Sequence, residues 1–328
     1  MSFISVLLAL LLEQARPLGR GNPVHASLRA WVRWSTRNFD AGKSVHGWLA
    51  WGFAVGGPFF AALGIYWLLD AFVGWPVAVV WSVAVLYATL GFRQFSFHFT
   101  EIRDALADGD EDLARELLAS WQLIDASELP RSEIVRHVIE HSVLSAHRHV
   151  FGVLAWFSVL AAFGFGPAGA VLYRLSEFVV RYWQHKSKTQ HQPVSEALLK
   201  TAANAWAAID WLPARITAIS FAVVGSFEEA IDGWRNYEPL SAGDNDGIIL
   251  AATSGAVNIK LGDVTRMAAY PADSASAMPS GLPGMQVEPA SGQTPELAHL
   301  AVIVGLVWRT VVMWMVLLAL LTLARLLG

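Results

Sequence analysis

Residues 47–92 read GWLAWGFAVGGPFFAALGIYWLLDAFVGWPVAVVWSVAVLYATLGF, and Asp70 is the single charged side chain among them. A helix needs about 20 apolar residues to cross the hydrocarbon core of a bilayer. Gly47–Phe72 and Gly74–Phe92 both approach or exceed that length, and the link at 74–76 carries a glycine and a proline. We therefore predict two membrane-spanning helices joined as a hairpin.

Both ends of the chain are also apolar. Leu297–Leu327 is the longest apolar run, and Arg309 interrupts it. At about 1.5 Å per residue this run exceeds one bilayer, so Arg309 is expected near an interface; a buried Arg309 would need a partner. Met1–Leu12 has neither a preceding basic residue nor a following small-residue cleavage site. We interpret it as a retained membrane helix or an interfacial helix.

Two further segments are ambiguous. Val150–Tyr173 carries no charge, but the glycines and proline of Gly164–Gly169 interrupt it, and neither half alone is long enough to cross. A re-entrant hairpin therefore competes with a kinked span. Trp211–Gly225 is a second short candidate, in which Pro213 suits the first turn of a helix.

The distribution of Lys and Arg tests these alternatives. Six lie in 13–46, six in 93–149, six in 174–215 and three in 226–296. Positive charge favours the cytoplasmic side, and a hairpin at 47–92 returns the chain to the side it left. Placing 174–215 on that side as well requires 150–173 to enter and leave on one face. The charge pattern favours the re-entrant hairpin.

The composition agrees with a membrane protein and excludes several function classes. Of the 328 residues, 55% are hydrophobic and only 15% are charged, and the mean hydropathy is +0.43. Soluble domains carry about a quarter charged residues. The net charge of −4 gives no basic excess for nucleic acid. The absence of cysteine excludes disulfides, thiolate zinc sites and a cysteine nucleophile.

Together these features predict an all-α fold: a polytopic helical membrane protein with a re-entrant Gly/Pro hairpin and polar helical loops. Residues 1–268 are expected to form the membrane domain, and 297–328 a C-terminal transmembrane helix. The Ala/Ser/Pro/Gly composition of 269–296 predicts a disordered linker. The lipid bilayer is the expected partner, and a homo-oligomer is left open.

Three short motifs were weighed as sites. His137 and His141 frame an H-x-x-E-H pattern whose histidines share a helix face, which makes them weak zinc candidates without an evident third ligand. The G-x-G-x-x-G at 164–169 lacks a preceding strand, so tight backbone packing explains it better than a dinucleotide. Arg148 could bind a lipid head group or an anionic ligand, and its simpler interpretation is an interfacial anchor. Arg215 could bind a carboxylate or a phosphate, and its simpler interpretation is a structural ion pair.

Five strings, in order, resemble the CobD/CbiB family of bacterial membrane proteins. They are GNPVHASLRAWVRW (21–34), ALADGDEDLARELLASW (105–121), GPAGAVLYR (166–174), DWLPARITA (210–218) and ATSGAVNIKLGD (252–263). The family includes adenosylcobinamide-phosphate synthase, which joins an aminopropanol phosphate to a corrinoid carboxylate, and AmpE-type regulators connected with β-lactamase induction and cell-wall signalling.

The carboxylate motifs of the synthase are not kept. Its E-S-x-A-E-N-x-x-D signature begins here at Glu140, but His141, Leu144, Ser145 and Arg148 replace Ser, Glu, Asn and Asp. Its N-T-L-D-S-M is replaced by EFVVRY at 177–182, and a paired Asp by Trp-Ala at 206–207. Holding Mg²⁺ against nucleotide phosphates needs carboxylates.

The resemblance therefore implies an AmpE-like regulatory or ligand-sensing protein of the bacterial cytoplasmic (inner) membrane, without synthase chemistry. No cofactor is expected, and Mg²⁺ and a nucleotide are implied only by the synthase alternative. The ligand would be a small anion, a corrinoid or a muropeptide-like molecule. Ligand contacts are assigned to Glu140, Arg148, Tyr173, Arg174 and Arg215.

Two other functions stay open. One is a divergent adenosylcobinamide-phosphate synthase whose acids come from Glu177, Asp210 or 244–246. The other is a small-solute transporter, on the strength of the broken apolar hairpin. Catalytic residues are not assigned.

Overall fold

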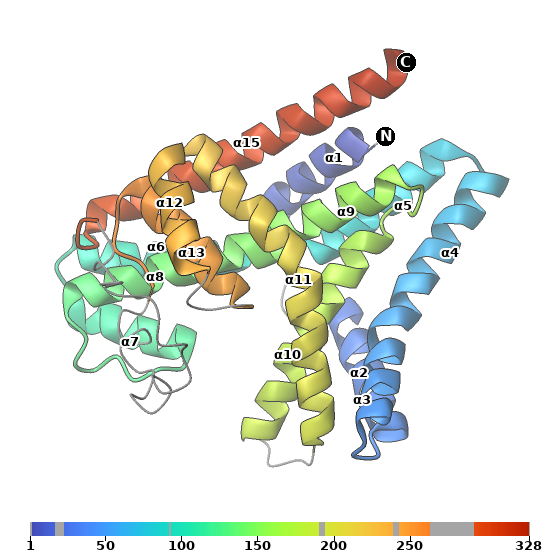
Figure 1. Cartoon of the computed structure of the whole chain (residues 1–328), viewed down its shortest axis with the longest axis horizontal. Helices are drawn as coiled ribbons and strands as arrows, with labels where there is room; N and C mark the ends of the chain where they lie inside the picture. Colours follow the sequence, from blue (N-terminus) through green and yellow to red (C-terminus); the bar gives the residue numbers. More distant parts are fainter. Residues whose placement is uncertain are drawn as a thin grey trace, which may run out of the picture. The chain divides into compact units, whose positions relative to one another are not determined.

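The computed structural model describes residues 2–16, 23–91, 93–189, 194–238, 243–262 and 292–327. These residues form helices and one isolated β-bridge, so the all-α prediction is confirmed (Figure 1). The first helices are α1 (Ser2–Ala15), α2 (Pro23–Phe39), α3 (Ser44–Trp51), the π-helix η1 (Gly52–Gly56), α4 (Gly57–Phe72), α5 (Trp75–Thr89), α6 (Arg93–Ala107) and α7 (Glu111–Gln122). They are followed by α8 (Arg131–Ala146), the π-helix η2 (His147–Phe151), α9 (Gly152–Ala162), α10 (Ala168–Thr189), α11 (Glu196–Val224), α12 (Phe227–Tyr237), α13 (Asn245–Val257) and α15 (Leu297–Leu327).

Four helical stretches of the described chain are long and apolar enough to cross a membrane. They are Ser44–Phe72, Arg131–Ala162, Glu196–Val224 and Leu297–Ala324. The first and last agree with the spans predicted from hydropathy. The other two are longer than the sequence indicated, because α8, η2 and α9 run on as one stretch and α11 extends well before Trp211.

The second arm of the predicted hairpin is shorter than expected. Helix α5 has 15 residues, or about 22 Å of helix, which is less than the hydrocarbon thickness of about 30 Å. It begins at Trp75 and ends at Thr89, and the backbone of the next residue, Leu90, is extended. Helices α4 and α5 do form a hairpin through Gly74, whose φ of +106° favours glycine. The hairpin is therefore confirmed, while a full second crossing is not supported by length.

The Gly/Pro break is a tight turn between α9 and α10. Gly164 and Gly166 have φ values of +83° and +54°, a region that side-chain-bearing residues rarely enter. The indole of Trp67 donates a hydrogen bond to the carbonyl of Gly164 at 3.0 Å. The two helices pack closely, since a Cβ on Gly169 would lie 2.1 Å from the carbonyl oxygen of Trp156. The hairpin exists, and its re-entry into the bilayer stays a prediction.

Packing divides the chain into two compact units. Unit 1 contains residues 1–97, 145–217 and 309–328, and unit 2 contains 98–144 and 218–308. The buried core of unit 1 joins α2, η1, α10 and α11 through residues such as Val32, Ala54, Trp183 and Leu198. In unit 2, Gly233 and Gly255 allow the backbones of α12 and α13 to touch. Helices α6, α8, α11 and α15 contribute residues to both units.

The boundary at 268 and nearly all of the predicted 269–296 linker lie outside the described residues and stay predictions. The residues on either side of this gap are paired. Ile259 and Gln293 form a parallel bridge, in which Lys260 N–H donates to the Gln293 carbonyl at 2.9 Å. Gln293 N–H donates in turn to the carbonyl of Asn258 at 3.0 Å. The bridge therefore holds the start of α15 beside the end of α13 within unit 2.

Candidate functional site

A fully buried polar cluster lies among three helices of unit 1. His147 places its Nδ1 2.9 Å from the hydroxyl of Thr217 and its Nε2 2.9 Å from Oδ1 of Asp210. The hydroxyl of Tyr173 donates to the same Asp210 oxygen at 2.8 Å. The side chains of His147 and Asp210 are 0% and 1% exposed. An imidazole held between a carboxylate and a hydroxyl can store a proton or stabilise a positive charge.

Local backbone features position these side chains. His147 opens the π-helical turn η2, which widens the helix where it passes the cluster. Such π-turns occur often at functional sites. Gly152 lies against the Tyr173 ring so closely that a Cβ would be 2.1 Å from the ring. The absence of a side chain at 152 therefore lets the Tyr173 hydroxyl reach Asp210.

Pro213 lies inside α11 rather than at its first turn, so the expected helix start there is wrong. A proline removes the N–H that would bond the carbonyl four residues earlier, which here is that of Ile209. The indole N–H of Trp156 on α9 donates to this carbonyl at 2.9 Å. A contact from another helix therefore supplies the missing donor one residue before Asp210.

The two carboxylate oxygens of Asp210 differ in their hydrogen bonding. Its Oδ2 is buried and accepts no hydrogen bond from the described protein atoms. Arg148 follows His147 on η2 and interacts electrostatically with both Asp210 and Tyr173. A carboxylate in an apolar interior is costly unless charged groups balance it. The cluster therefore combines an acid, a histidine and an arginine between candidate membrane helices.

The structure brings two of the predicted ligand residues, Arg148 and Tyr173, to this cluster. Arg174 instead pairs with Glu177, whose other oxygen lies 2.7 Å from Nε of Arg181. Arg215 is stacked over the Trp211 ring at 4.3 Å and donates to the Trp211 carbonyl. Their roles as ligand contacts stay predictions.

Glu140 belongs to unit 2 and secures a turn there. Its carboxylate accepts a hydrogen bond from Gly262 N–H at 2.8 Å, and Arg136 donates to the Gly262 carbonyl at 3.2 Å. Glu140, where the synthase signature would begin, thereby contacts the family string that ends at 263. His141 packs edge-on against Trp121. Among the described residues no group of three metal-ligating side chains accompanies His137 or His141.

Of the acids that the synthase alternative would need, Glu177 and Asp244 are engaged by protein groups, while Asp210 has one buried oxygen that accepts no hydrogen bond from the described protein atoms. Glu177 lies between two arginines, and Asp210 holds His147 and Tyr173. Asp244 caps α13 by accepting from Gly247 N–H at 3.0 Å and takes the Tyr237 hydroxyl at 2.6 Å. Among the described residues no three acids or histidines lie together as metal ligands. These acids therefore do not form a Mg²⁺–nucleotide site in the described arrangement, and we derive no chemical step through one.

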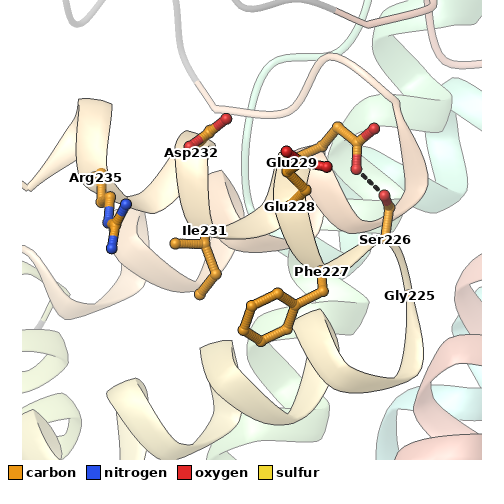
Figure 2. A pocket seen from close by; sticks show the side chains of 8 residues that line it. All are labelled: Gly225, Ser226, Phe227, Glu228, Glu229, Ile231, Asp232 and Arg235. Atoms are coloured by element: carbon orange, nitrogen blue, oxygen red, sulfur yellow. Dashed lines mark hydrogen bonds between the residues drawn. The ribbon is translucent and has the colours of Figure 1, made fainter.

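An open pocket of about 800 Å³ lies at the start of α12 in unit 2 (Figure 2). It is lined by the carboxylates of Glu228, Glu229 and Asp232 and by Arg235. The Ser226 hydroxyl donates to the Glu229 carboxylate, which ties the pocket rim to the helix start. None of the predicted ligand residues lines this pocket.

Sequence reasoning missed the central pair, His147 and Asp210. His147 lies in the string around Arg148 that was interpreted as an interfacial anchor. Asp210 was considered as a structural ion pair with Arg215 and as a candidate acid of the synthase alternative. The available signal was their position in long apolar stretches, because ionisable residues within membrane helices usually face a partner or a functional site. The pairing itself joins residues 63 positions apart.

Comparison with known proteins resolves the family. The profile described as "CobD/Cbib protein" matches residues 3–283. The chain belongs to the CobD/CbiB family. A relative named cobalamin biosynthesis protein CobD, from Stutzerimonas stutzeri, is 29% identical over 325 residues, which is 96% of both chains. CobD of Chromobacterium violaceum is 33% identical over 57% of each chain, and that of Leptospira interrogans is 30% identical over 58% of this chain and 59% of its own. No solved structure matches the chain.

These relatives correct the expected branch of the family. Each carries the name cobalamin biosynthesis protein CobD, and none carries the name AmpE. The AmpE-like regulatory role expected from the degraded carboxylate motifs therefore has no support. The branch was misassigned because the loss of acidic residues indicates only that metal binding is weakened. It does not indicate the pathway in which the protein acts.

Proposed function

We propose that this CobD/CbiB family protein acts in cobalamin biosynthesis at the bacterial inner membrane, with a corrinoid as its substrate. The reaction implied by the family resemblance is the attachment of an aminopropanol phosphate to a corrinoid side-chain carboxylate. The observation that carries the proposal is the end-to-end similarity to a protein named for cobalamin biosynthesis, over 96% of both chains.

The fold supports a membrane location. Four helical stretches of the described chain have the length and hydropathy of membrane spans, and many of their large apolar side chains face outward. Phe60, Trp67, Leu68 and Phe72 of α4 are all more than half exposed. Exposed apolar surface on this scale is stable in hydrocarbon and unstable in water.

The buried cluster is the proposed functional centre of unit 1. Attack of an amine on a carboxyl carbon that a nucleotide has already activated displaces the activating phosphate group and releases a proton from the amine. A histidine oriented by a carboxylate is suited to accept that proton. Because His147 is fully buried in the described arrangement, the proposal requires the α9–α10 hairpin to open toward substrate.

Complementation tests the pathway. A bacterial strain that lacks adenosylcobinamide-phosphate synthase and depends on cobalamin is supplied with this chain. Growth without added cobalamin, together with the aminopropanol-containing corrinoid in extracts, is the expected result. Normal membrane expression without growth or corrinoid product would contradict the proposed function.

Variants test the site. Asp210→Asn keeps the shape of the side chain and can still accept from Tyr173, but it removes the charge facing His147. We expect at least about a hundredfold loss of product, in line with the loss of a general base. The matched control is Asp108→Asn, at an exposed position of unit 2, which is expected to keep full growth. Equal growth of the two variants would contradict the assignment of the centre.

A further inference from the structure

One side of α2 carries a row of arginines. Arg29, Arg33 and Arg37 follow one another at intervals of four residues, and all three are exposed. Side chains four apart lie above one another on the same helix face. The row is therefore a continuous basic stripe about two turns long.

The stripe is fixed in place beside α10. The indole of Trp183 donates to the Thr36 hydroxyl at 2.9 Å, and Val32 belongs to the same buried core as Trp183. On the neighbouring face of α2, the Ser35 hydroxyl donates to the Ala50 carbonyl at 2.7 Å. Since α2 is held by polar and apolar contacts from two elements, its basic face cannot rotate away.

A fourth cation comes from α10. Lys186 is half-buried one turn beyond Trp183. Its burial, together with the charges of Arg37 and Arg33, lowers the pKa of Lys186. The hydrogen bond from Trp183 to Thr36 brings this part of α10 against α2 between Arg33 and Arg37. Like charges held this close cost free energy that a bound anion would recover.

The protein supplies no counter-charge that the structure describes. In the described ranges, no carboxylate lies within ion-pair distance of Arg29, Arg33, Arg37 or Lys186. The acid that directly follows α2, Asp40, accepts from the hydroxyl and N–H of Ser195 at 2.5 and 3.0 Å. It is therefore engaged at the start of α11.

Aromatic residues next to the stripe place it at a bilayer surface. Trp31 and Trp34 are stacked with ring centroids 5.1 Å apart, and about half of Trp34 is exposed. Trp48, at the beginning of the span Ser44–Phe72, is similarly exposed. Tryptophan collects at the head-group level of membranes, and a helix with arginines on one face and aromatic residues beside them is suited to lie there.

From this arrangement we infer that Arg29, Arg33, Arg37 and Lys186 form a binding face for the phosphate groups of anionic phospholipids. The face is open, it lies beside an aromatic rim, and it directly precedes a membrane span. These features match a lipid head group held at the interface better than a free phosphate ester, which needs an enclosing pocket. The inference is independent of the proposed reaction.

The test measures lipid preference of the full chain in nanodiscs. Discs contain either phosphatidylcholine alone or an equal mixture with phosphatidylglycerol, and lipids retained after gentle release are counted by native mass spectrometry. The wild-type chain is expected to retain phosphatidylglycerol preferentially. In the triple variant Arg33→Gln, Arg37→Gln, Lys186→Gln, the ratio of retained phosphatidylglycerol to phosphatidylcholine is expected to fall. The expected fall is roughly fivefold for each cation removed, which corresponds to about 1 kcal/mol each.

The matched control removes the same charge elsewhere. Arg103, Arg235 and Lys260 are exposed cations of unit 2, and the variant with all three changed to Gln is expected to keep the wild-type preference. If the stripe triple is not recovered folded, Lys186→Gln alone serves, with a smaller loss. No wild-type preference, or equal loss in the control, would overturn the inference. Displacement of the lipid by millimolar inorganic phosphate would also overturn it, because the site would then select a free anion.

Discussion

Two side-chain contacts to an aspartate in this protein have similar distances and very different surroundings. In unit 1, Nε2 of His147 lies 2.9 Å from Asp210, and both side chains are almost completely buried. In unit 2, Arg115 on α7 lies 2.8 Å from Asp112 and 3.1 Å from Glu111, and the Asp112 side chain is 96% exposed. The first pair belongs to helices expected in hydrocarbon, and the second to a helix with a solvated face.

The comparison teaches that the same contact has different consequences in the two units. Water screens the ion pairs of Arg115 and can hydrate either partner, so these pairs contribute little to the free energy of unfolding. Removal of Asp210 leaves the Tyr173 hydroxyl and His147 Nε2 with each other, 3.2 Å apart, as neighbours, and it takes away the buried charge and the acceptor that both groups share. Four substitutions, from the largest expected effect to the smallest, test this contrast.

Asp210→Ala is expected to have the largest effect, a loss of about 3 kcal/mol in the free energy of unfolding, because it removes the buried charge and the acceptor that His147 and Tyr173 share. The measurement is an unfolding titration with sodium dodecyl sulfate in a fixed detergent. Asp232→Ala, at an exposed acid of α12, is the control and is expected to change little. A loss of equal size in the two variants would remove the distinction between the units.

Gly169→Ala tests whether the α9–α10 hairpin packs as tightly as the cluster requires. The new Cβ would lie 2.1 Å from the carbonyl oxygen of Trp156, which is backbone and cannot swing aside. We expect a loss of about 2 kcal/mol from overpacking. Gly64→Ala, where no atom lies within 4 Å, is expected to be neutral or slightly stabilising, because alanine favours helix. The same unfolding titration measures both variants. An unchanged free energy of unfolding for Gly169→Ala would contradict the close packing of α9 against α10.

Trp156→Phe is expected to cost about 1 kcal/mol, because the Ile209 carbonyl loses its donor. Pro213→Ala restores the helical N–H for that carbonyl. The cost of Trp156→Phe should therefore shrink when Pro213→Ala is already present. A double-mutant cycle measures this coupling, and strictly additive effects would mean that the indole does not replace the missing helical donor.

Glu111→Gln is expected to have the smallest effect, below about 1 kcal/mol, since Arg115 keeps Asp112 and exposed pairs contribute little. The residual effect should weaken further as the salt concentration rises. A salt-independent loss as large as that of Asp210→Ala would show that this part of unit 2 is also shielded from water.

Much of the fold could be predicted from hydropathy, because apolar length is a local property. The spans near 47–72 and 297–327 were found in this way. The continuous stretch Arg131–Ala162 was missed, because His137 and Arg148 made its first part look like a helix at the membrane surface. The structure pairs His147 with residues of two other helices, and such pairing removes the cost that a hydropathy count assigns to polar residues.

The site was harder to predict because its contacts are tertiary. Tyr173 was selected from its family motif and lies in the cluster, yet its partner Asp210 is 37 positions away. Pro213 was expected to begin a helix, and it lies within one only because Trp156 supplies a donor from α9. No local pattern carries such a contact. Arg215 was expected to contact a ligand, and its stacking on Trp211 was not foreseen.

The bridge between Ile259 and Gln293 has a consequence for how this chain tolerates change in length. Since the backbone at 292–293 is anchored to that at 258–260, the start of α15 is located by this pairing and not by the number of residues in between. The entropy of closing a loop grows only with the logarithm of its length. A change in chain length between the two paired segments should therefore leave the bridge, and with it the start of the last helix, in place.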